Sequence, residues 1–87
     1  MNRQEIQAKI IEHLAEELGG QVEKSAIKLE SSLRDDLGLD SMAAATYIME
    51  LEEGFAITVY EEEILPLEKV NDVIDLVQKK IEEKNKN

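Results

Sequence analysis

The chain of 87 residues has no cysteine, only one histidine, one proline and three aromatic residues. Without cysteine, neither a disulfide bond nor a thiolate zinc site can supplement the small hydrophobic core that a chain of this length buries. The single histidine, His13, has no second histidine or cysteine with which to share a metal ion. We therefore expect no resident metal site, and we interpret His13 as a solvated or helix-packing residue.

Long hydrophobic runs are also absent. No apolar stretch approaches the roughly 20 residues that a membrane-spanning helix needs, and residues 1–5 lack the hydrophobic region of a secretion signal. Twenty acidic residues against ten basic residues give a net charge of −10, which repels nucleic acid and anionic lipid and attracts basic surfaces. We expect a soluble, cytoplasmic monomer that forms a single domain over residues 1–87.

Three stretches have the spacing of long amphipathic helices: residues 4–18, 42 to about 53, and 70–83. The first repeats an apolar residue at every fourth position, and the last has the clearest apolar stripe. In the second stretch, five residues can share one face at helical spacing: Met42, Ala45, Ile48, Leu51 and Phe55.

Glycine and proline place the ends of these helices. The pair at 19–20 is typical of a helix C-terminus, and Gly54 predicts the end of the second helix. A short helix fits residues 60–65, directly before the single proline. The sequence thus predicts an all-α fold, a small bundle of three main helices plus one short helix, ordered over about 4–83 and followed by a polar tail at 84–87.

Residues 21–40 join the first two helices without a helical period, but they are too apolar for a disordered linker. We expect a long packed loop, and a loop of this length in a small domain usually serves a site. It leads to segment 36–42, Asp-Leu-Gly-Leu-Asp-Ser-Met. Behind the flexible Gly38, Asp40 or Ser41 can cap the next helix, whose free amides and dipole would favour a phosphate on the Ser41 hydroxyl.

Ser41 does not have the surroundings of a catalytic nucleophile. Such a serine needs a base, usually an oriented histidine, together with oxyanion donors. His13 is distant in sequence, the charged residues nearest to Ser41 are carboxylates, and residues 38–41 do not fit the Gly-x-Ser-x-Gly pattern. The apolar residues between Asp36 and Asp40 also exclude an EF-hand calcium loop. The sequence therefore indicates an attachment point and not an enzyme active site.

Segment 36–42 resembles the phosphopantetheine attachment motif of the acyl carrier proteins, a family of phosphopantetheine-binding carriers whose motif is typically Asp-Leu-Gly-x-Asp-Ser-Leu. The resemblance continues through the first helix, the long loop, the end of the second helix at 50–55 and the last helix at 70–81. Because both the motif and the order of the elements agree, the resemblance is specific and covers most of the chain.

The resemblance implies that the chain is a carrier and not an enzyme. Ser41 would receive 4′-phosphopantetheine from coenzyme A through a separate phosphopantetheinyl transferase that uses Mg²⁺, so that this chain is a substrate. The thiol that the chain lacks would arrive on this cofactor and hold acyl intermediates as thioesters. Gly38 belongs to the loop of the motif, and Asp40 is expected to help hold the magnesium during loading, to cap the helix, or to do both.

In this family, partner enzymes recognise the second helix through its acidic and exposed apolar residues. The resemblance gives this role to the following residues here: Met42, Met49, Glu50, Glu52 and Glu53. Flexible methionine side chains suit surfaces that bind several partners, although both could instead pack in the core. The implied partners are the transferase and acyl-transferring or acyl-modifying enzymes with basic docking surfaces.

The chain departs from fatty-acid-synthase carriers just after the serine. Where acids are common, it has Ala-Ala-Ala-Thr at 43–46, and Tyr47 stands where an aliphatic residue is common. This neutral start favours a carrier for a specialised lipid or polyketide pathway over ordinary fatty acid biosynthesis, unless the alanines only raise helix propensity. Small Ala45 is also expected to leave an apolar cleft near the cofactor, beside the following residues: Ile48, Leu51, Phe55, Ile64 and Val70.

Three functions stay open at this point. The chain could carry fatty or related acyl groups, or it could carry polyketide or amino-acyl intermediates by the same chemistry. It could instead be a non-enzymatic helical protein-interaction module, in which Ser41 is only a helix cap worth about 1 kcal/mol.

Overall fold

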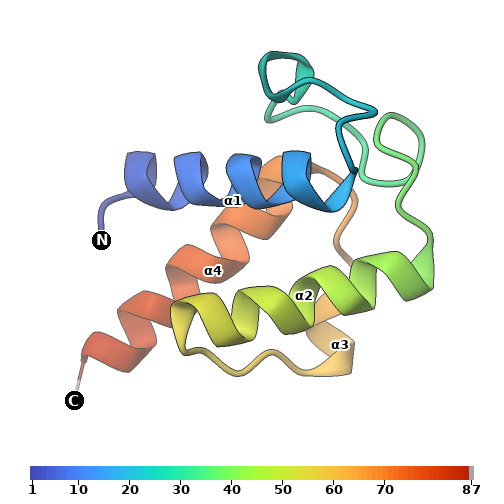
Figure 1. Cartoon of the computed structure of the whole chain (residues 1–87). Coiled ribbons are helices and arrows are strands. Elements are labelled where there is room, and N and C mark those ends of the chain that lie inside the picture. The colour runs from blue at the N-terminus through green and yellow to red at the C-terminus, as the bar shows by residue number, and fades with distance from the viewer. Residues whose placement is uncertain (87) are drawn as a thin grey trace.

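The computed structural model describes residues 1–86, which form a helical bundle (Figure 1). Its elements are α1 (Arg3–Glu17), the 3₁₀ helix η1 (Lys24–Ala26), α2 (Ser41–Phe55), α3 (Glu61–Ile64) and α4 (Val70–Asn85). The predicted all-α fold of three main helices and one short helix is confirmed. Asn87, the last residue of the predicted tail, lies outside the described residues.

The long helices pack at an angle to one another (Figure 1). α1 and α2 run in opposite directions, α4 crosses behind them, and the short α3 lies beside α2. Both termini lie on one side of the molecule, whereas α2 begins on the other side, where the connection from α1 arrives. Within residues 1–86, no helix combines the length and the apolar character that crossing a membrane requires.

The core is almost entirely aliphatic. Each long helix turns one stripe of residues inward, and burying each such side chain stabilises the fold by about 1.5–3 kcal/mol. In α1 this stripe is the predicted one: Ile6, Ile10 and Leu14. In α4 it is again the predicted one: Val70, Val73, Ile74, Val77 and Ile81.

The inward face of α2 differs from the prediction. Ile48, Leu51 and Phe55 are buried as expected, but Met42 and Ala45 are exposed, and Tyr47 is buried instead. The prediction followed the small and aliphatic residues and overlooked that a tyrosine can be buried when its hydroxyl finds a partner. The fully buried residues of α2 therefore begin at Tyr47. In its first turn Ser41 and Met42 are exposed, and Ala43 and Ala44 are half-buried.

The end of α2 also corrects the prediction. Gly54 is helical, and the helix continues to Phe55 before Ala56 adopts the left-handed conformation, with φ 55° and ψ 49°. The amides of Ala56 and Ile57 both donate to the carbonyl oxygen of Glu52, which closes the helix without glycine. The side-chain space at Gly54 points instead at α1, where an added Cβ would lie 3.6 Å from Cε1 of His13.

The other helix ends agree more closely with the sequence. α1 ends at the predicted glycine pair, and it begins at Arg3 because the Asn2 side chain accepts a hydrogen bond from the Glu5 amide. α4 continues two residues past its predicted end, to Asn85, so the first two residues of the predicted polar tail are helical.

The connection between α1 and α2 is a packed loop, as predicted. It buries Ile27, Leu33, Leu37 and Leu39, and it contains the short helix η1, which the sequence did not reveal. Its backbone is also bonded to the segment before α4, since the Leu33 amide donates to the carbonyl of Glu68 at 2.9 Å. These contacts fix the end of the loop that leads to Ser41.

Candidate functional site

The chain folds back on itself just before Ser41. The Ser32 amide donates to the Asp36 carboxylate at 2.7 Å, and the Leu39 amide donates to the carbonyl of Leu33 at 2.8 Å. Within this turn Gly38 has a φ of +71°, in the left-handed region that glycine adopts without strain. An added Cβ would have nothing within 4 Å, so the backbone conformation and not the available space explains this glycine.

Asp40 caps α2. Its backbone is extended, its Oδ1 accepts a hydrogen bond from the Ala43 amide at 2.8 Å, and its carbonyl accepts one from Ala44 at 2.8 Å. This is the geometry of an N-cap residue. Ser41 is therefore the first residue of the helix, and its hydroxyl is not the cap that the interaction-module hypothesis assumed.

The Ser41 side chain lies at the exposed start of a helix of 15 residues. At this end of a helix the first amides point outward and the dipole is positive, which stabilises a negatively charged group by about 0.3–1 kcal/mol at the surface. An exposed hydroxyl in this position can be esterified from outside, and it keeps the resulting phosphate next to the helix amides. The site therefore fits a phosphate-linked group.

A cleft of about 510 Å³ opens beside Ser41. Its apolar lining includes three of the six residues expected there: Ala45, Ile48 and Ile64. The other three, Leu51, Phe55 and Val70, are buried in the core and do not line the cleft. All its lining residues belong to the loop before α2, to α2, to α3 with the segment after it, and to α4: Ser32, Leu33, Arg34, Asp35, Leu39, Asp40, Ser41, Ala44, Ala45, Tyr47, Ile48, Glu61, Ile64, Leu65, Leu67, Glu68 and Val73.

Tyr47 is the part of this cleft that sequence analysis did not predict. Its side chain is only 1% exposed, and its hydroxyl donates to the carbonyl oxygen of Ile10 on α1 at 2.8 Å. Burial raises the pKa of the Tyr47 phenol, and the carboxylates of Glu50 and Glu17 raise it further, so the hydroxyl stays protonated. The Tyr47 hydroxyl can therefore keep donating its hydrogen bond to the carbonyl of Ile10.

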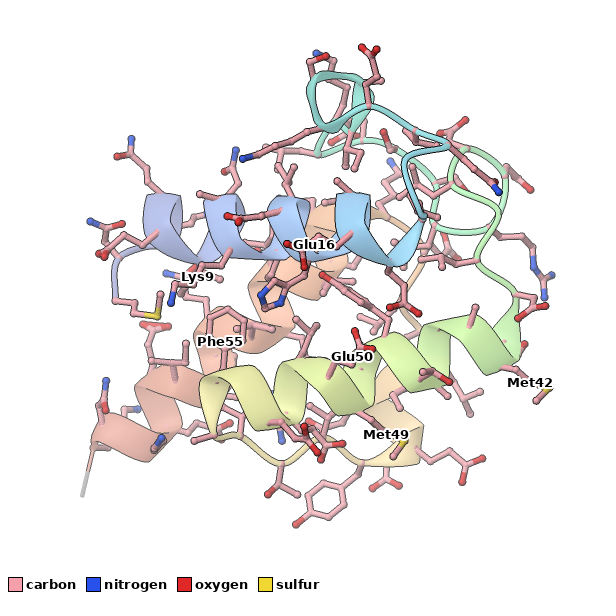
Figure 2. The ribbon with its side chains drawn as sticks, in the orientation of Figure 1. Lys9, Glu16, Met42, Met49, Glu50 and Phe55 are labelled. Atoms are coloured by element: carbon pink, nitrogen blue, oxygen red, sulfur yellow. The ribbon has the colours of Figure 1, made fainter. Side chains whose placement is uncertain are left out.

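The two methionines that were proposed for partner recognition lie at the surface. Met42 is 81% exposed and Met49 is 64% exposed, and their spacing of two helical turns places them on one side of α2 together with Glu53. Figure 2 shows Met49 on the side of α2 that faces away from α1. Core packing, the other possibility for these methionines, is excluded.

The three acidic candidates have different surroundings. Glu50 points toward α1 (Figure 2), where it lines a surface depression with His13, Glu16 and Glu17. Desolvation and the negative charge of Glu17 raise the pKa of Glu50, and His13 partly offsets this. Within residues 1–86, no group of three or more potential ligands is arranged to hold a metal ion.

Glu52 and Glu53 lie near the end of α2. The Oε2 of Glu52 accepts a hydrogen bond from the Val59 amide at 3.0 Å, which holds the chain that leaves α2. Glu53 is exposed. Of the three acids, Glu53 therefore shares the outer face of α2 with the methionines, and Glu50 lies on the edge beside α1. One carboxylate oxygen of Glu52 is occupied by the hydrogen bond from the Val59 amide.

Comparison with known proteins places this geometry in a family. Residues 8–77 match the family described as phosphopantetheine attachment site. An acyl carrier protein of Phytoplasma mali is 38% identical over 74 residues, which is 85% of this chain and 86% of that protein. The chain belongs to the acyl carrier protein family. A second relative, the acyl carrier protein of Rubrobacter xylanophilus, is 40% identical over 77 residues, 88% of this carrier and 93% of that protein.

The similarity of the fold also supports membership of this family. The crystal structure of an acyl carrier protein from Thermotoga maritima superposes with a TM-score of 0.81 and 36% sequence identity, and the match covers 97% of this carrier and 95% of that chain. The prosthetic group of the family is 4′-phosphopantetheine, so the protein is a carrier of acyl groups and not a catalyst. The hypothesis of an interaction module without this group is not supported.

Proposed function

We propose that Ser41 is the residue that carries 4′-phosphopantetheine. Ser41 is exposed, it is the first residue of α2, and it lines the cleft. The neighbouring Asp40 already supplies the N-cap, which leaves the serine hydroxyl available. The observation that carries the proposal is this combination of the Asp-Leu-Gly-Leu-Asp-Ser motif with a free hydroxyl at a helix N-terminus.

In the loading reaction the Oγ of Ser41 forms a bond to the phosphorus of the phosphopantetheine part of coenzyme A, and the bond to the nucleotide part breaks. The hydroxyl proton goes to a base of the transferase, since residues 35–49 around Ser41 contain neither histidine nor lysine. Asp40 would offer its carboxylate to a magnesium ion held by the transferase, and that ion would neutralise the phosphate charge. The carrier itself supplies the acceptor hydroxyl and its position.

Mass spectrometry of the intact protein tests the attachment. The folded chain is incubated with a permissive phosphopantetheinyl transferase, Mg²⁺ and coenzyme A, and we expect a mass increase of one phosphopantetheine. Ser41→Ala should abolish the increase. The matched control is Ser25→Ala, which removes another exposed serine outside the motif and should load like the wild type. Absence of the adduct on folded wild-type protein would refute the proposal.

The outer face of α2 is the surface that we expect partners to bind. It presents two exposed methionines near an exposed acid, Glu53, with Glu50 and Glu52 at its edges. A basic partner surface is attracted to the acidic half and an apolar pocket fits the methionines. The partners are the transferase and acyl-transferring or acyl-modifying enzymes with such surfaces.

Charge-reversal variants distinguish an effect of the outer face of α2 from an effect of the net charge of the protein. Glu53→Lys should raise the KM of the transferase for the carrier, and adding salt should weaken loading of the wild type more than loading of the variant. Glu82→Lys makes the same change at an exposed position on α4 and serves as the control. Equal effects of the two substitutions would show that only net charge matters.

The uncharged start of α2 bears on the pathway that the carrier serves. Residues 43–46, in the first two turns of α2, are three alanines and a threonine, so the surface around Ser41 is uncharged on the helix side. We expect a carrier in the cytoplasm that serves a specialised lipid or polyketide pathway. Introducing acids at Ala43 and Thr46 should then improve acylation by ordinary fatty-acid enzymes; unchanged acylation would remove the missing charges as the determinant.

A further inference from the structure

Tyr47 forms the side of the cleft that faces α1. The residue is buried and lines the cleft, and its hydroxyl is bonded to the carbonyl of Ile10 at 2.8 Å. Every residue that lines the cleft comes from the loop, α2, α3 with its following segment, or α4. The side chain of Tyr47 therefore lies between the cleft on one side and the core around α1 on the other.

This tyrosine is held in place at both ends of its side chain. Its backbone lies inside α2, and its hydroxyl is bonded to α1 in a buried position. The neighbouring residues Ile48 and Leu51 are also buried. Turning the ring aside would break a hydrogen bond whose acceptor lies in the interior, where no water can replace it. A ligand in the cleft thus meets a rigid wall and not a movable side chain.

A group attached to Ser41 would be tethered beside the cleft. Ser41 lines the cleft, so a group attached there enters without the entropy loss of free association. The deeper lining is apolar, with Ile48, Ile64 and Val73, which suits an alkyl chain and not a charged group. The part of the occupant that can be sheltered is therefore the hydrocarbon of an acyl thioester.

We propose that Tyr47 sets the length of the acyl chain that this carrier can shelter, by closing the cleft toward α1. The proposal depends on attachment at Ser41 and names the class of cargo, a short acyl chain. Methylene groups are buried until the chain reaches the tyrosine ring, and those beyond that point stay in solvent. With a smaller aliphatic residue at this position, the cleft would continue toward the core around Ile10.

The dependence of stability on chain length tests the proposal. The carrier is loaded from acyl-coenzyme A substrates that range from acetyl to dodecanoyl, and loading is verified by intact mass. The melting temperature of each species is then compared with that of the same protein before loading. Each fully buried methylene group should raise the melting temperature by roughly 3–6 °C. In the wild type we expect this increase to stop abruptly at one chain length.

Variants at Tyr47 should move this breakpoint. Tyr47→Leu and Tyr47→Met both remove the ring, and in either of them the increase should continue to longer chains by at least two carbons. Tyr47→Phe keeps the ring but loses the hydrogen bond to Ile10, so its breakpoint should lie closer to that of the wild type than the breakpoints of the leucine and methionine variants do. Leu14→Ala is the control, because it weakens the buried core on α1 without changing a residue that lines the cleft.

The outcomes separate the two proposals. A longer breakpoint in the leucine or methionine variant, with no change in Leu14→Ala, supports the role of Tyr47. The same breakpoint in all variants, or no breakpoint in the wild type, overturns it while attachment at Ser41 stands. If the mass shows no adduct on the wild type, attachment fails, and the inference about Tyr47 fails with it.

Discussion

The Nζ of Lys80 on α4 lies 2.8 Å from the Oε1 of Glu63 on α3, and the two side chains are only 15% and 22% exposed. The same ammonium group lies 5.3 Å from the ring centroid of Tyr60, at the N-cap of α3. α3 has four residues and no fully buried side chain. Because a helix this short is marginal by itself, these contacts hold one wall of the cleft in place.

Lys80→Met should loosen α3 without unfolding the protein. The substitution keeps an apolar stem over Tyr60 and removes the charge that binds Glu63. We therefore expect the hydrogen-bonded amides of Glu63, Leu65 and Leu67 to exchange faster with solvent. Hydrogen exchange followed by NMR measures this directly. Lys79→Met removes the neighbouring, exposed lysine and should leave these rates unchanged. Equal exchange in both variants would contradict the prediction.

The pair also predicts a pH dependence. The Lys80 ammonium and the hydrogen bond from the Tyr60 amide lower the pKa of Glu63, and Glu63 raises the pKa of Lys80. The stabilisation from Glu63 is present above the carboxyl's ordinary pKa of about 4.3 and is lost as pH falls through its lowered value. That from Lys80 is present below about 10.4 and is lost as pH rises through its raised value. The difference in exchange between wild type and Lys80→Met should therefore persist from pH 5 to 9 and disappear in acid.

Periodicity and the loop motif were sufficient to predict the bundle. Apolar residues at every third or fourth position define α1 and α4 because an aliphatic stripe has to be buried whatever its partner is. The position of Ser41 at the start of α2 also follows from local signals, since an aspartate before a helical pattern is a strong N-cap. Both predictions rest on interactions between residues close in sequence.

The features that sequence did not reveal depend on distant residues. Tyr47 can be buried because a carbonyl on α1 accepts a hydrogen bond from its hydroxyl. No pattern of neighbouring residues in the sequence predicts that acceptor. α2 continues beyond Gly54 because the amides of Ala56 and Ile57 donate hydrogen bonds to the carbonyl of Glu52. The rule that a helix ends at a glycine does not take such hydrogen bonds into account. Glu52 likewise looked like a free surface acid, but its carboxylate binds the Val59 amide.

The two roles expected of Asp40 can be separated by two substitutions. Asp40→Ala removes the oxygen that accepts the Ala43 amide and should cost about 1 kcal/mol, which lowers the melting temperature by roughly 4–8 °C. Asp40→Asn keeps a cap oxygen and should melt close to the wild type. If the carboxylate holds magnesium during loading, both variants load phosphopantetheine slowly. Loading of Asp40→Asn at the wild-type rate would leave Asp40 with the cap alone.

Ala56→Gly should stabilise the fold. Ala56 is exposed and ends α2 in the left-handed conformation, with φ 55°, which costs a residue with a Cβ about 1–2 kcal/mol. Glycine removes this cost but gains freedom in the unfolded chain worth about 0.4–1 kcal/mol, so the net gain, taken between the midpoints of the two ranges, is roughly 0.8 kcal/mol. Urea unfolding measures it. Ala8→Gly, at an exposed position inside α1, should lose about 1 kcal/mol; destabilisation by both changes would contradict this account.

Glu50 makes stability depend on salt and pH. Desolvation and the charge of Glu17 raise its pKa, so the folded carrier holds a proton more tightly than the unfolded chain, and stability rises as pH falls through the raised pKa toward about 4.3. With a net charge of −10, added salt should raise the melting temperature as well. Glu50→Gln removes the repulsion: at low salt it should melt above the wild type, with a weaker response to salt and acid. Glu82→Gln, at an exposed site on α4, controls for net charge, and a wild-type pH profile in Glu50→Gln would show that the Glu17–Glu50 contact does not limit stability.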